Sequence, residues 1–157
     1  MSIIVRPMTI ADLPAVIAIE KRSFPTPWSF WLFFQEILSP QRHYVVAQEA
    51  GRVVGYAGMS YVLDEGHVTT LAVDPSRRRQ GIGQRLLNEL VDTALRLGLA
   101  FLTLEVRESN EVAQALYRKT GFVVEGRRKD YYCSPSEDAI IMTLHLDRSP
   151  FRADEDA

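Results

Sequence analysis

The residues with the clearest capacity for chemistry are 77–87, which read RRRQGIGQRLL. Arginines lead into Gly81 and Gly83, and an apolar helical pattern begins directly after them. A helix N-terminus binds anions because its first backbone N–H groups lack partners and carry the positive end of the helix dipole. Glycine allows a ligand to approach the backbone closely, and arginine binds phosphate oxygens in pairs. The segment predicts a pyrophosphate-binding loop; the alternative is a solvated turn before an arginine-rich helix.

This loop does not match two common nucleotide-binding motifs. No Gly-Lys-Ser/Thr sequence follows the glycines, which argues against a P-loop. Leu86 stands where the dinucleotide fingerprint has its third glycine. The strand before the loop is also expected in an antiparallel meander rather than in a parallel βαβ unit. A Rossmann-type site is therefore disfavoured.

The elements that must position the loop follow an α/β order. Strands are expected at 3–6, 43–49, 52–61, 67–73, 100–106, from 122 onward and at 138–146. Helices are expected after a Thr9-x-x-Asp12 capping box, at 29–38, at 82–97 and from about 110 to 121. The helical stripe of 82–97 includes Leu86, Leu90 and Leu95. This order predicts a central mixed, mostly antiparallel sheet of about seven strands with helices on both faces.

Composition limits the class of protein. The chain has 157 residues, 46% of them hydrophobic, with a formal net charge of −2, which favours one domain with a real core and gives no global signal for nucleic acid. Cys133 is the only cysteine, which excludes an intramolecular disulfide and a cysteine-built metal site. No signal-peptide pattern or apolar run of roughly 18 residues is found. We expect a cytoplasmic protein without a metal and without a direct nucleic-acid or membrane partner, and its oligomeric state stays open.

Several stretches resemble a known superfamily. Arg78-x-x-Gly81-x-Gly83, directly after Leu71-Ala72-Val73-Asp74-Pro75, resembles the acetyl-CoA motif of the GNAT N-acetyltransferases, and the order of elements is similar across 3–147. LEVRESNEVAQALYRKTGF (104–122), RRKDYY (127–132) and EDAIIMTL (137–144) resemble the bacterial ribosomal-protein-alanine N-acetyltransferases. Archaeal and eukaryotic N-terminal acetyltransferases carry similar stretches. The resemblance implies a GNAT fold, with a GNAT domain over 1–147 and a polar, flexible tail over 148–157.

The resemblance also implies the roles of individual residues. The backbone of Leu71, Ala72 and Val73 would pair with the pantetheine arm of acetyl-CoA, near which Asn110 would also lie. The pyrophosphate would be held by the segment comprising Arg78, Arg79, Gln80, Gly81, Ile82, Gly83 and Gln84. Glu105 matches the general base of the family and Tyr117 the general acid. The loops bordering the acceptor groove would supply Phe24, Trp28, Tyr131 and Tyr132, although the aromatic residues of 28–34 could instead pack a helix onto the sheet.

Two of these roles suit the positions of the residues. Glu105 is in the middle of an expected strand, on the face of Thr103 and Arg107, where a carboxylate is unusual; the alternative is a strand-end glutamate paired with a nearby arginine. Tyr117 could instead pack with its hydroxyl in water. Acetyl transfer to an amine requires removal of a proton from the amine and protonation of the leaving thiolate. Cys133 as a covalent nucleophile is disfavoured, and His43, His67 and His145 are interpreted as structural.

The expected acceptor is a protein N-terminus, and the resemblance implies the alanine of a ribosomal protein. At pH 7, roughly 10–15% of an α-amine is unprotonated, against about 0.04% of a lysine amine. A weak carboxylate base therefore favours α-amines. The alternatives are transfer to lysine or to a small-molecule amine, and a non-catalytic acyl-CoA-binding module that regulates a partner.

Overall fold

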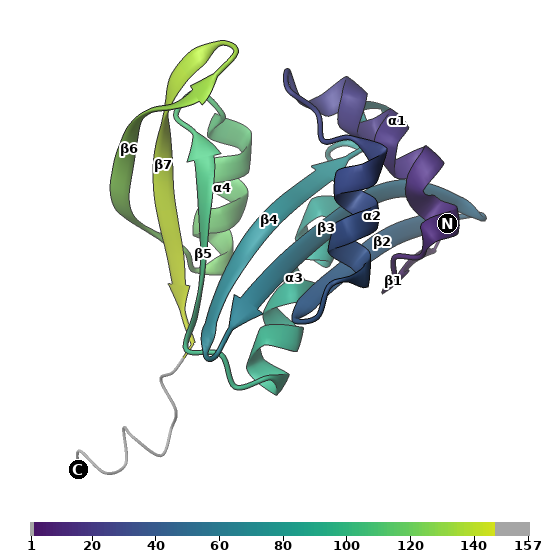
Figure 1. Ribbon diagram of the computed structural model, residues 1–157, viewed down its shortest axis with the longest axis horizontal. Helices are drawn as coiled ribbons and strands as arrows, with labels where there is room; N and C mark the ends of the chain where they lie inside the picture. The colour runs from purple at the N-terminus through teal and green to yellow at the C-terminus, as the bar shows by residue number, and fades with distance from the viewer. Residues whose placement is uncertain (1, 147–157) are drawn as a thin grey trace. The chain divides into compact units, whose positions relative to one another are not determined.

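The computed structural model describes residues 2–146, which divide into two compact units (Figure 1). Unit 1 contains the described residues up to Ser60 together with Val68–Leu90, and unit 2 contains Tyr61–His67 and the described residues from Val91 onward. The tail expected at 148–157 lies outside the described residues.

The described strands confirm the expected mixed sheet. They are β1 (Ile3–Pro7), β2 (Arg42–Glu49), β3 (Arg52–Val62), β4 (Glu65–Val73), β5 (Phe101–Arg107), β6 (Val123–Cys133) and β7 (Ser136–His145). They are hydrogen-bonded in the order β1-β2-β3-β4-β5-β7-β6. Neighbouring strands β1–β2, β2–β3, β5–β7 and β6–β7 are antiparallel, whereas β4 and β5 are parallel.

The helices also occur where the sequence predicts them. They are α1 (Leu13–Ser23), α2 (Phe30–Leu38), α3 (Ile82–Arg96) and α4 (Glu111–Thr120), with short 3-10 turns at Ile10–Asp12 and Pro75–Arg77. In unit 1, α1 and α2 cover one face of the strands and α3 lies on the other (Figure 1). The expectation of helices on both faces is therefore confirmed for this unit.

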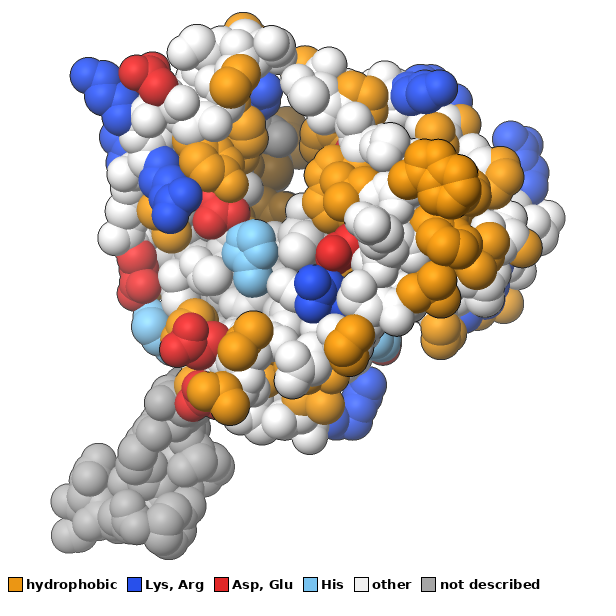
Figure 2. All heavy atoms as spheres, in the orientation of Figure 1, with side chains coloured by type: hydrophobic (Ala, Val, Ile, Leu, Met, Phe, Trp, Pro, Cys, Tyr) orange, Lys and Arg blue, Asp and Glu red, His pale blue; other side chains and the backbone are white. Residues whose placement is uncertain are grey.

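The core of unit 1 forms where α1 and α2 pack on the sheet. Leu13, Val16 and Ile19 of α1 are buried, and Phe33 of α2 packs edge-on against Tyr56 of β3 with ring centroids 5.7 Å apart. The opposite side of α2 leaves Trp31 and Leu38 exposed, and apolar side chains gather over this helix in Figure 2. The expected stripe of α3 is buried at Leu86 and Leu90, but Leu95 is 53% exposed, so that part of the pattern was wrong.

A buried carboxylate fixes the chain between α1 and α2. Glu20 is buried and accepts hydrogen bonds from the Tyr56 hydroxyl and from the backbone N–H of Trp28, the latter at 2.9 Å. Burial raises the pKa of Glu20, although both hydrogen bonds oppose that rise. The segment FPTPWS is thus tied to the core of unit 1 through the backbone of Trp28.

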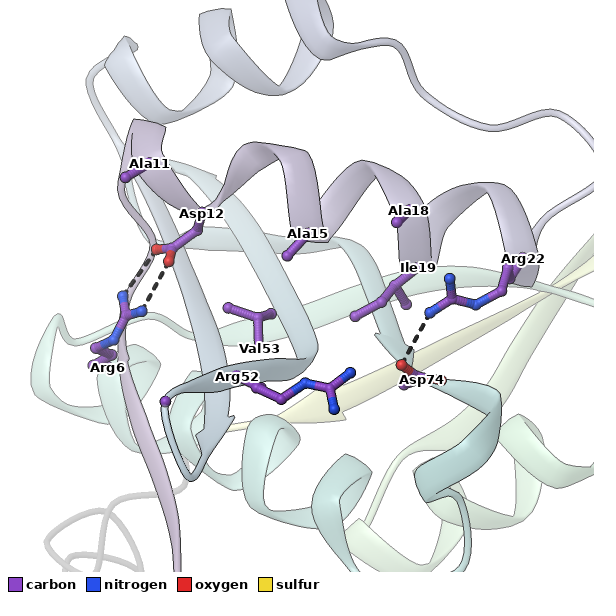
Figure 3. A pocket seen from close by; sticks show the side chains of 11 residues that line it. Arg6, Ala11, Asp12, Ala15, Ala18, Ile19, Arg22, Arg52, Val53 and Asp74 are labelled. Carbon is purple, nitrogen blue, oxygen red and sulfur yellow. Dashed lines mark hydrogen bonds and ion pairs between the residues drawn. The ribbon is translucent and has the colours of Figure 1, made fainter.

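The expected capping box is present at the 3-10 turn Ile10–Asp12, which leads into α1. The backbone N–H of Thr9 donates to the Asp12 carboxylate at 2.8 Å, and the Arg6 guanidinium donates two further hydrogen bonds to it, both at 2.8 Å. A hollow of about 400 Å³ lies beside these residues, and Figure 3 shows Arg6, Asp12, Arg22, Arg52 and Asp74 around it. Both carboxylates that line the hollow form ion pairs: Asp12 with Arg6, and Asp74 with Arg22 at 2.9 Å.

In unit 2, β5 pairs with β7 along its whole length. Leu102, Leu104 and Val106 are buried on one face of β5, and they alternate with partly buried residues on the other, as the sequence predicts. β4 enters this unit through Glu65, Gly66 and His67, which pair with Phe101, Leu102 and Thr103. These pairings determine which polar side chains meet on the second face of β5.

Candidate active site

The predicted pyrophosphate loop begins at a firmly anchored turn in unit 1. After β4, the Asp74 backbone N–H donates to the Val54 carbonyl at 2.8 Å. The Asp74 carboxylate accepts from the Ser76 N–H at 3.0 Å and from Arg22, and these contacts lower its pKa. Arg77 forms an ion pair with Glu49 at the end of β2. The side chains before Arg78 are therefore occupied in holding the turn.

The loop itself exposes its cationic side chains and its backbone. Arg78, Arg79 and Gln80 are exposed, and no hydrogen-bond or ion-pair partner is found for Arg79 among the described residues. Gly81 has a φ of +80°, in the left-handed region, and a Cβ built on it would meet no atom within 4 Å. The first N–H groups of α3 follow at Ile82 and lack intrahelical partners, as in any helix. Backbone donors, an exposed arginine and open space above the glycine suit a phosphate ligand.

The other residues expected to contact acetyl-CoA lie on β4 and before α4. Ala72 is buried, while Leu71 and Val73 on either side of it are partly buried. Asn110 caps α4, because its side-chain oxygen accepts the Ala113 backbone N–H at 3.1 Å. This gives Asn110 a structural role, and its contact with the cofactor stays a prediction.

Glu105 lies in the middle of β5 in unit 2, as expected. Its side chain is 19% exposed, and Oε1 is 2.8 Å from Nε2 of His67. The hydrogen bond from His67 is the main reason that the pKa of Glu105 is lowered; burial opposes it, and the charges of His67 and Arg128 add to it. The alternative of a strand-end glutamate bonded to an arginine is thus wrong: the residue is mid-strand and its hydrogen-bond partner is a histidine.

The contact with His67 was missed by the sequence analysis, which treated this histidine as structural. His67 pairs with Thr103 in the parallel β4–β5 register, and Thr103 and Glu105 share one face of β5 because they are two residues apart. The His67 imidazole on β4 therefore reaches the Glu105 carboxylate on the neighbouring strand β5. The only signal in the sequence was a polar ring at the start of a strand, and its partner is 38 residues away.

Tyr117 is the second residue with catalytic potential in unit 2. It lies in α4, is 8% exposed, and its ring packs on Phe122 with centroids 5.6 Å apart. Its hydroxyl makes no hydrogen bond with any residue of 2–146. Burial raises the pKa of Tyr117 to about 12, with a smaller contribution from Tyr132. The phenol therefore keeps its proton at neutral pH and has it available for donation.

The two tyrosines expected to contact the acceptor lie near Glu105. Tyr131 and Tyr132 meet edge-on with ring centroids 5.0 Å apart, and the Arg107 guanidinium lies 4.3 Å from the centroid of the Tyr132 ring. Burial is the main cause of the raised pKa of both phenols, and the Glu105 charge contributes to each. Unit 2 therefore brings together Glu105, His67, Tyr131 and Tyr132.

Phe24 and Trp28, the other residues expected to contact the acceptor, belong to unit 1. Both pack against its core, and the Trp28 ring lies 5.0 Å from that of Phe33. The packing role that the sequence left open is therefore present, and any contact of these residues with an acceptor stays a prediction.

Other kinds of site find no support within 2–146. No group of three or more His, Cys, Asp or Glu residues there could hold a metal ion. Cys133 is exposed and is the last residue of β6. Within the same range, no helix has the length and apolar character needed to cross a membrane.

The fold and these residues are suited to acyl transfer. Unit 1 carries a helix start with exposed arginines and backbone N–H groups, and unit 2 carries a carboxylate with a lowered pKa and a phenol with a raised pKa. Residues 13–122 match the family model described as Acetyltransferase (GNAT) family, and the chain belongs to this family. It is an acetyl-CoA-dependent N-acetyltransferase.

Two sequence relatives and one crystal structure are similar to this chain along most of its length. The [ribosomal protein bS18]-alanine N-acetyltransferase of Escherichia coli K12 is 40% identical over 137 residues, which cover 86% of this chain and 92% of that protein. The N-alpha-acetyltransferase RimI of Mycobacterium tuberculosis is 42% identical over 141 residues, with 86% and 87% covered. The crystal structure of the ribosomal-protein-S18-alanine N-acetyltransferase from E. coli superimposes with a TM-score of 0.87 at 36% identity, covering 94% of this chain and 96% of that chain.

Proposed function

We propose that this enzyme acetylates the N-terminal α-amine of a ribosomal protein, namely an N-terminal alanine such as that of bS18. The name of the E. coli relative supports an N-terminal alanine of a ribosomal protein, and the name of the M. tuberculosis relative supports an α-amine. The observation that carries the proposal is Glu105, a largely buried carboxylate that is held ionised by His67 beside two tyrosines. Ribosomal proteins are made in the cytoplasm, and we place the enzyme there.

Each reacting group has a residue suited to it. Glu105 takes a proton from the acceptor ammonium, directly or through one water molecule. The amine nitrogen then attacks the carbonyl carbon of the thioester; a C–N bond forms, and the C–S bond breaks when the tetrahedral intermediate collapses. Tyr117 donates its hydroxyl proton to the departing thiolate of coenzyme A. The amine nitrogen loses its second proton to solvent, and solvent returns a proton to the Tyr117 phenolate, so the enzyme is restored. The exposed loop of Arg78, Arg79 and Gly81 holds the pyrophosphate, and the backbone of Leu71–Val73 holds the pantetheine arm.

The lowered pKa of Glu105 favours an α-amine over a lysine amine. A carboxylate with a lowered pKa is a weak base, so the cost of removing the proton depends strongly on the pKa of the amine. The two amines differ by about 2.5 pKa units, which corresponds to about 3.4 kcal/mol or a factor of several hundred. Tyr131 and Tyr132 provide hydroxyls beside Glu105 that can bind the backbone of the first acceptor residues.

A peptide panel tests this proposal. Three peptides of one sequence are compared at equal acetyl-CoA: one with a free N-terminal alanine, one with that amine blocked, and one blocked with an internal lysine. We expect kcat/KM to be at least a hundredfold higher for the free N-terminus, from the difference in amine pKa. Equal rates on the free peptide and on the blocked lysine peptide would establish lysine as the acceptor. Failure to acetylate any of the three peptides would contradict a peptide acceptor.

The tyrosine pair provides a second test of the same acceptor. Simultaneous replacement of Tyr131 and Tyr132 by alanine is expected to raise KM for the peptide more than KM for acetyl-CoA. The matched control is Tyr61→Ala, which removes a tyrosine of unit 2 that the proposal gives no role. An unchanged peptide KM in the double variant would remove these residues from acceptor binding.

A further inference from the structure

His67 has a chemical relation to Glu105 that packing alone does not require. A carboxylate can only accept hydrogen bonds, so in the 2.8 Å contact it is Nε2 of His67 that carries the proton and donates to Oε1. No other described side chain donates a hydrogen bond to Glu105. The bond engages Oε1, and no described side chain donates to Oε2.

The surroundings of Glu105 explain why such a donor matters. The carboxylate is largely buried, and the residue paired with it on β7 is the apolar Ile141. From β6, it faces the two phenols Tyr131 and Tyr132 and the cation Arg128, which acts on it only through space. Burial favours the neutral acid, which cannot act as a base. Among the described side chains, His67 is the one that opposes this effect through a direct hydrogen bond, and the backbone of Glu105 adds a smaller contribution.

We propose that His67 is a positioning residue for the general base, and that it holds the Glu105 carboxylate ionised and oriented with Oε2 free to take the proton of the acceptor amine. This inference rests on the proposed role of Glu105 but not on the identity of the acceptor. In this proposal the His67 imidazole acts through Glu105. It serves neither as a metal ligand nor as a nucleophile.

The link between protonation of Glu105 and activity determines how removal of His67 changes the pH dependence of the rate. Removal of the His67 donor leaves burial less opposed, so the pKa of Glu105 rises. The base works only when it is ionised, and activity is lost as pH falls through its pKa. A raised pKa therefore moves this acidic loss to higher pH. The rate deficit of a His67→Ala variant is consequently largest at low pH and decreases as pH rises.

Two measurements on the full chain test the proposal. In the first, the Glu105 carboxyl carbon is followed by ¹³C NMR during pH titration of the wild type and of His67→Ala, which requires no substrate. In the second, kcat/KM is measured against pH with whichever amine the wild type accepts best. We expect a higher Glu105 midpoint in His67→Ala, a loss of about tenfold to a hundredfold in kcat/KM at the acidic end, and partial recovery in His67→Gln, which keeps an N–H donor.

His145 provides a matched control. Its Nε2 lies 2.7 Å from Oε2 of Glu125, so it makes the same kind of contact between neighbouring strands of unit 2, but away from Glu105. His145→Ala is expected to leave both the Glu105 titration and the pH–rate profile unchanged. An unshifted Glu105 midpoint in a folded His67→Ala protein would overturn the proposal. A rate loss that is equal at every pH and is not restored by His67→Gln would also overturn it. If the wild type acetylates no N-terminal peptide, the proposed acceptor fails, and the NMR titration still decides the role of His67.

Discussion

Replacement of Tyr117 by phenylalanine is expected to lower turnover without a matching loss of stability. The ring is buried against Phe122, but the hydroxyl has no hydrogen-bond partner among the described residues. Tyr117→Phe therefore keeps the packing and leaves no other group unsatisfied, so the free energy of unfolding should change by less than about 1 kcal/mol. Loss of a general acid lowers turnover by about 10²–10⁴-fold, which corresponds to about 2.7–5.4 kcal/mol in the activation barrier.

Tyr44 provides the opposite case for the same substitution. It is 5% exposed, close to the 8% of Tyr117, but its hydroxyl lies 2.8 Å from both Glu36 and Thr69. Tyr44→Phe should therefore cost about 1–3 kcal/mol of stability, because polar partners lose a hydrogen bond, and should leave turnover nearly unchanged. The assay combines urea unfolding with steady-state release of free coenzyme A. A folded Tyr117→Phe enzyme with wild-type turnover would refute the assignment of Tyr117 as proton donor.

The remaining predictions concern the base, the phosphate loop and the N-terminal ion pair. Glu105→Gln should lower kcat by about 10²–10⁴-fold while the calorimetric Kd for acetyl-CoA stays within about twofold; a wild-type pH–rate profile would contradict the role of Glu105 as base. Gly81→Ala should weaken acetyl-CoA binding by about tenfold, whereas Gly51→Ala, at the same φ of +80° and with the same open space, should cost similar stability but leave binding unchanged; equal Kd values for the two variants would remove the loop assignment. Asp12→Asn should cost about 2 kcal/mol of stability near neutral pH, because Arg6 holds the pKa of Asp12 below its usual value. This stabilisation is present above the unfolded-state pKa of about 3.9 and is lost as pH falls through the lower folded-state pKa. Urea unfolding should therefore show the stability difference between variant and wild type closing below about pH 4, and a difference independent of pH would contradict the prediction.

Local features of the fold could be predicted from the sequence because neighbouring residues determine them. The Thr9–Asp12 capping box and the alternation along β5 are both present as expected. The sequence singled out Gly81 for close approach of a ligand, and its left-handed φ was learned from the structure. Leu95 was misjudged because helical periodicity predicts a face of the helix but not which positions on that face are covered.

The chemistry of the site was less predictable because it depends on strand register. Glu105 was identified, but its donor His67 comes from a different strand, and only the pairing of His67 with Thr103 brings the two together. The free hydroxyl of Tyr117 is likewise a property of the surrounding structure. The hydrogen bond from the Trp28 backbone to Glu20 connects residues eight apart through a loop whose path the sequence does not define.

The central claim of this account is that the acetyl group goes to an N-terminal α-amine. The most direct test incubates the purified acceptor ribosomal protein, with its natural N-terminal alanine, with enzyme and isotope-labelled acetyl-CoA, and locates the label by tandem mass spectrometry. We predict one labelled acetyl group per acceptor, carried by the first residue, and none with the Glu105→Gln enzyme. A label on lysine side chains with an unmodified first residue would contradict the claim.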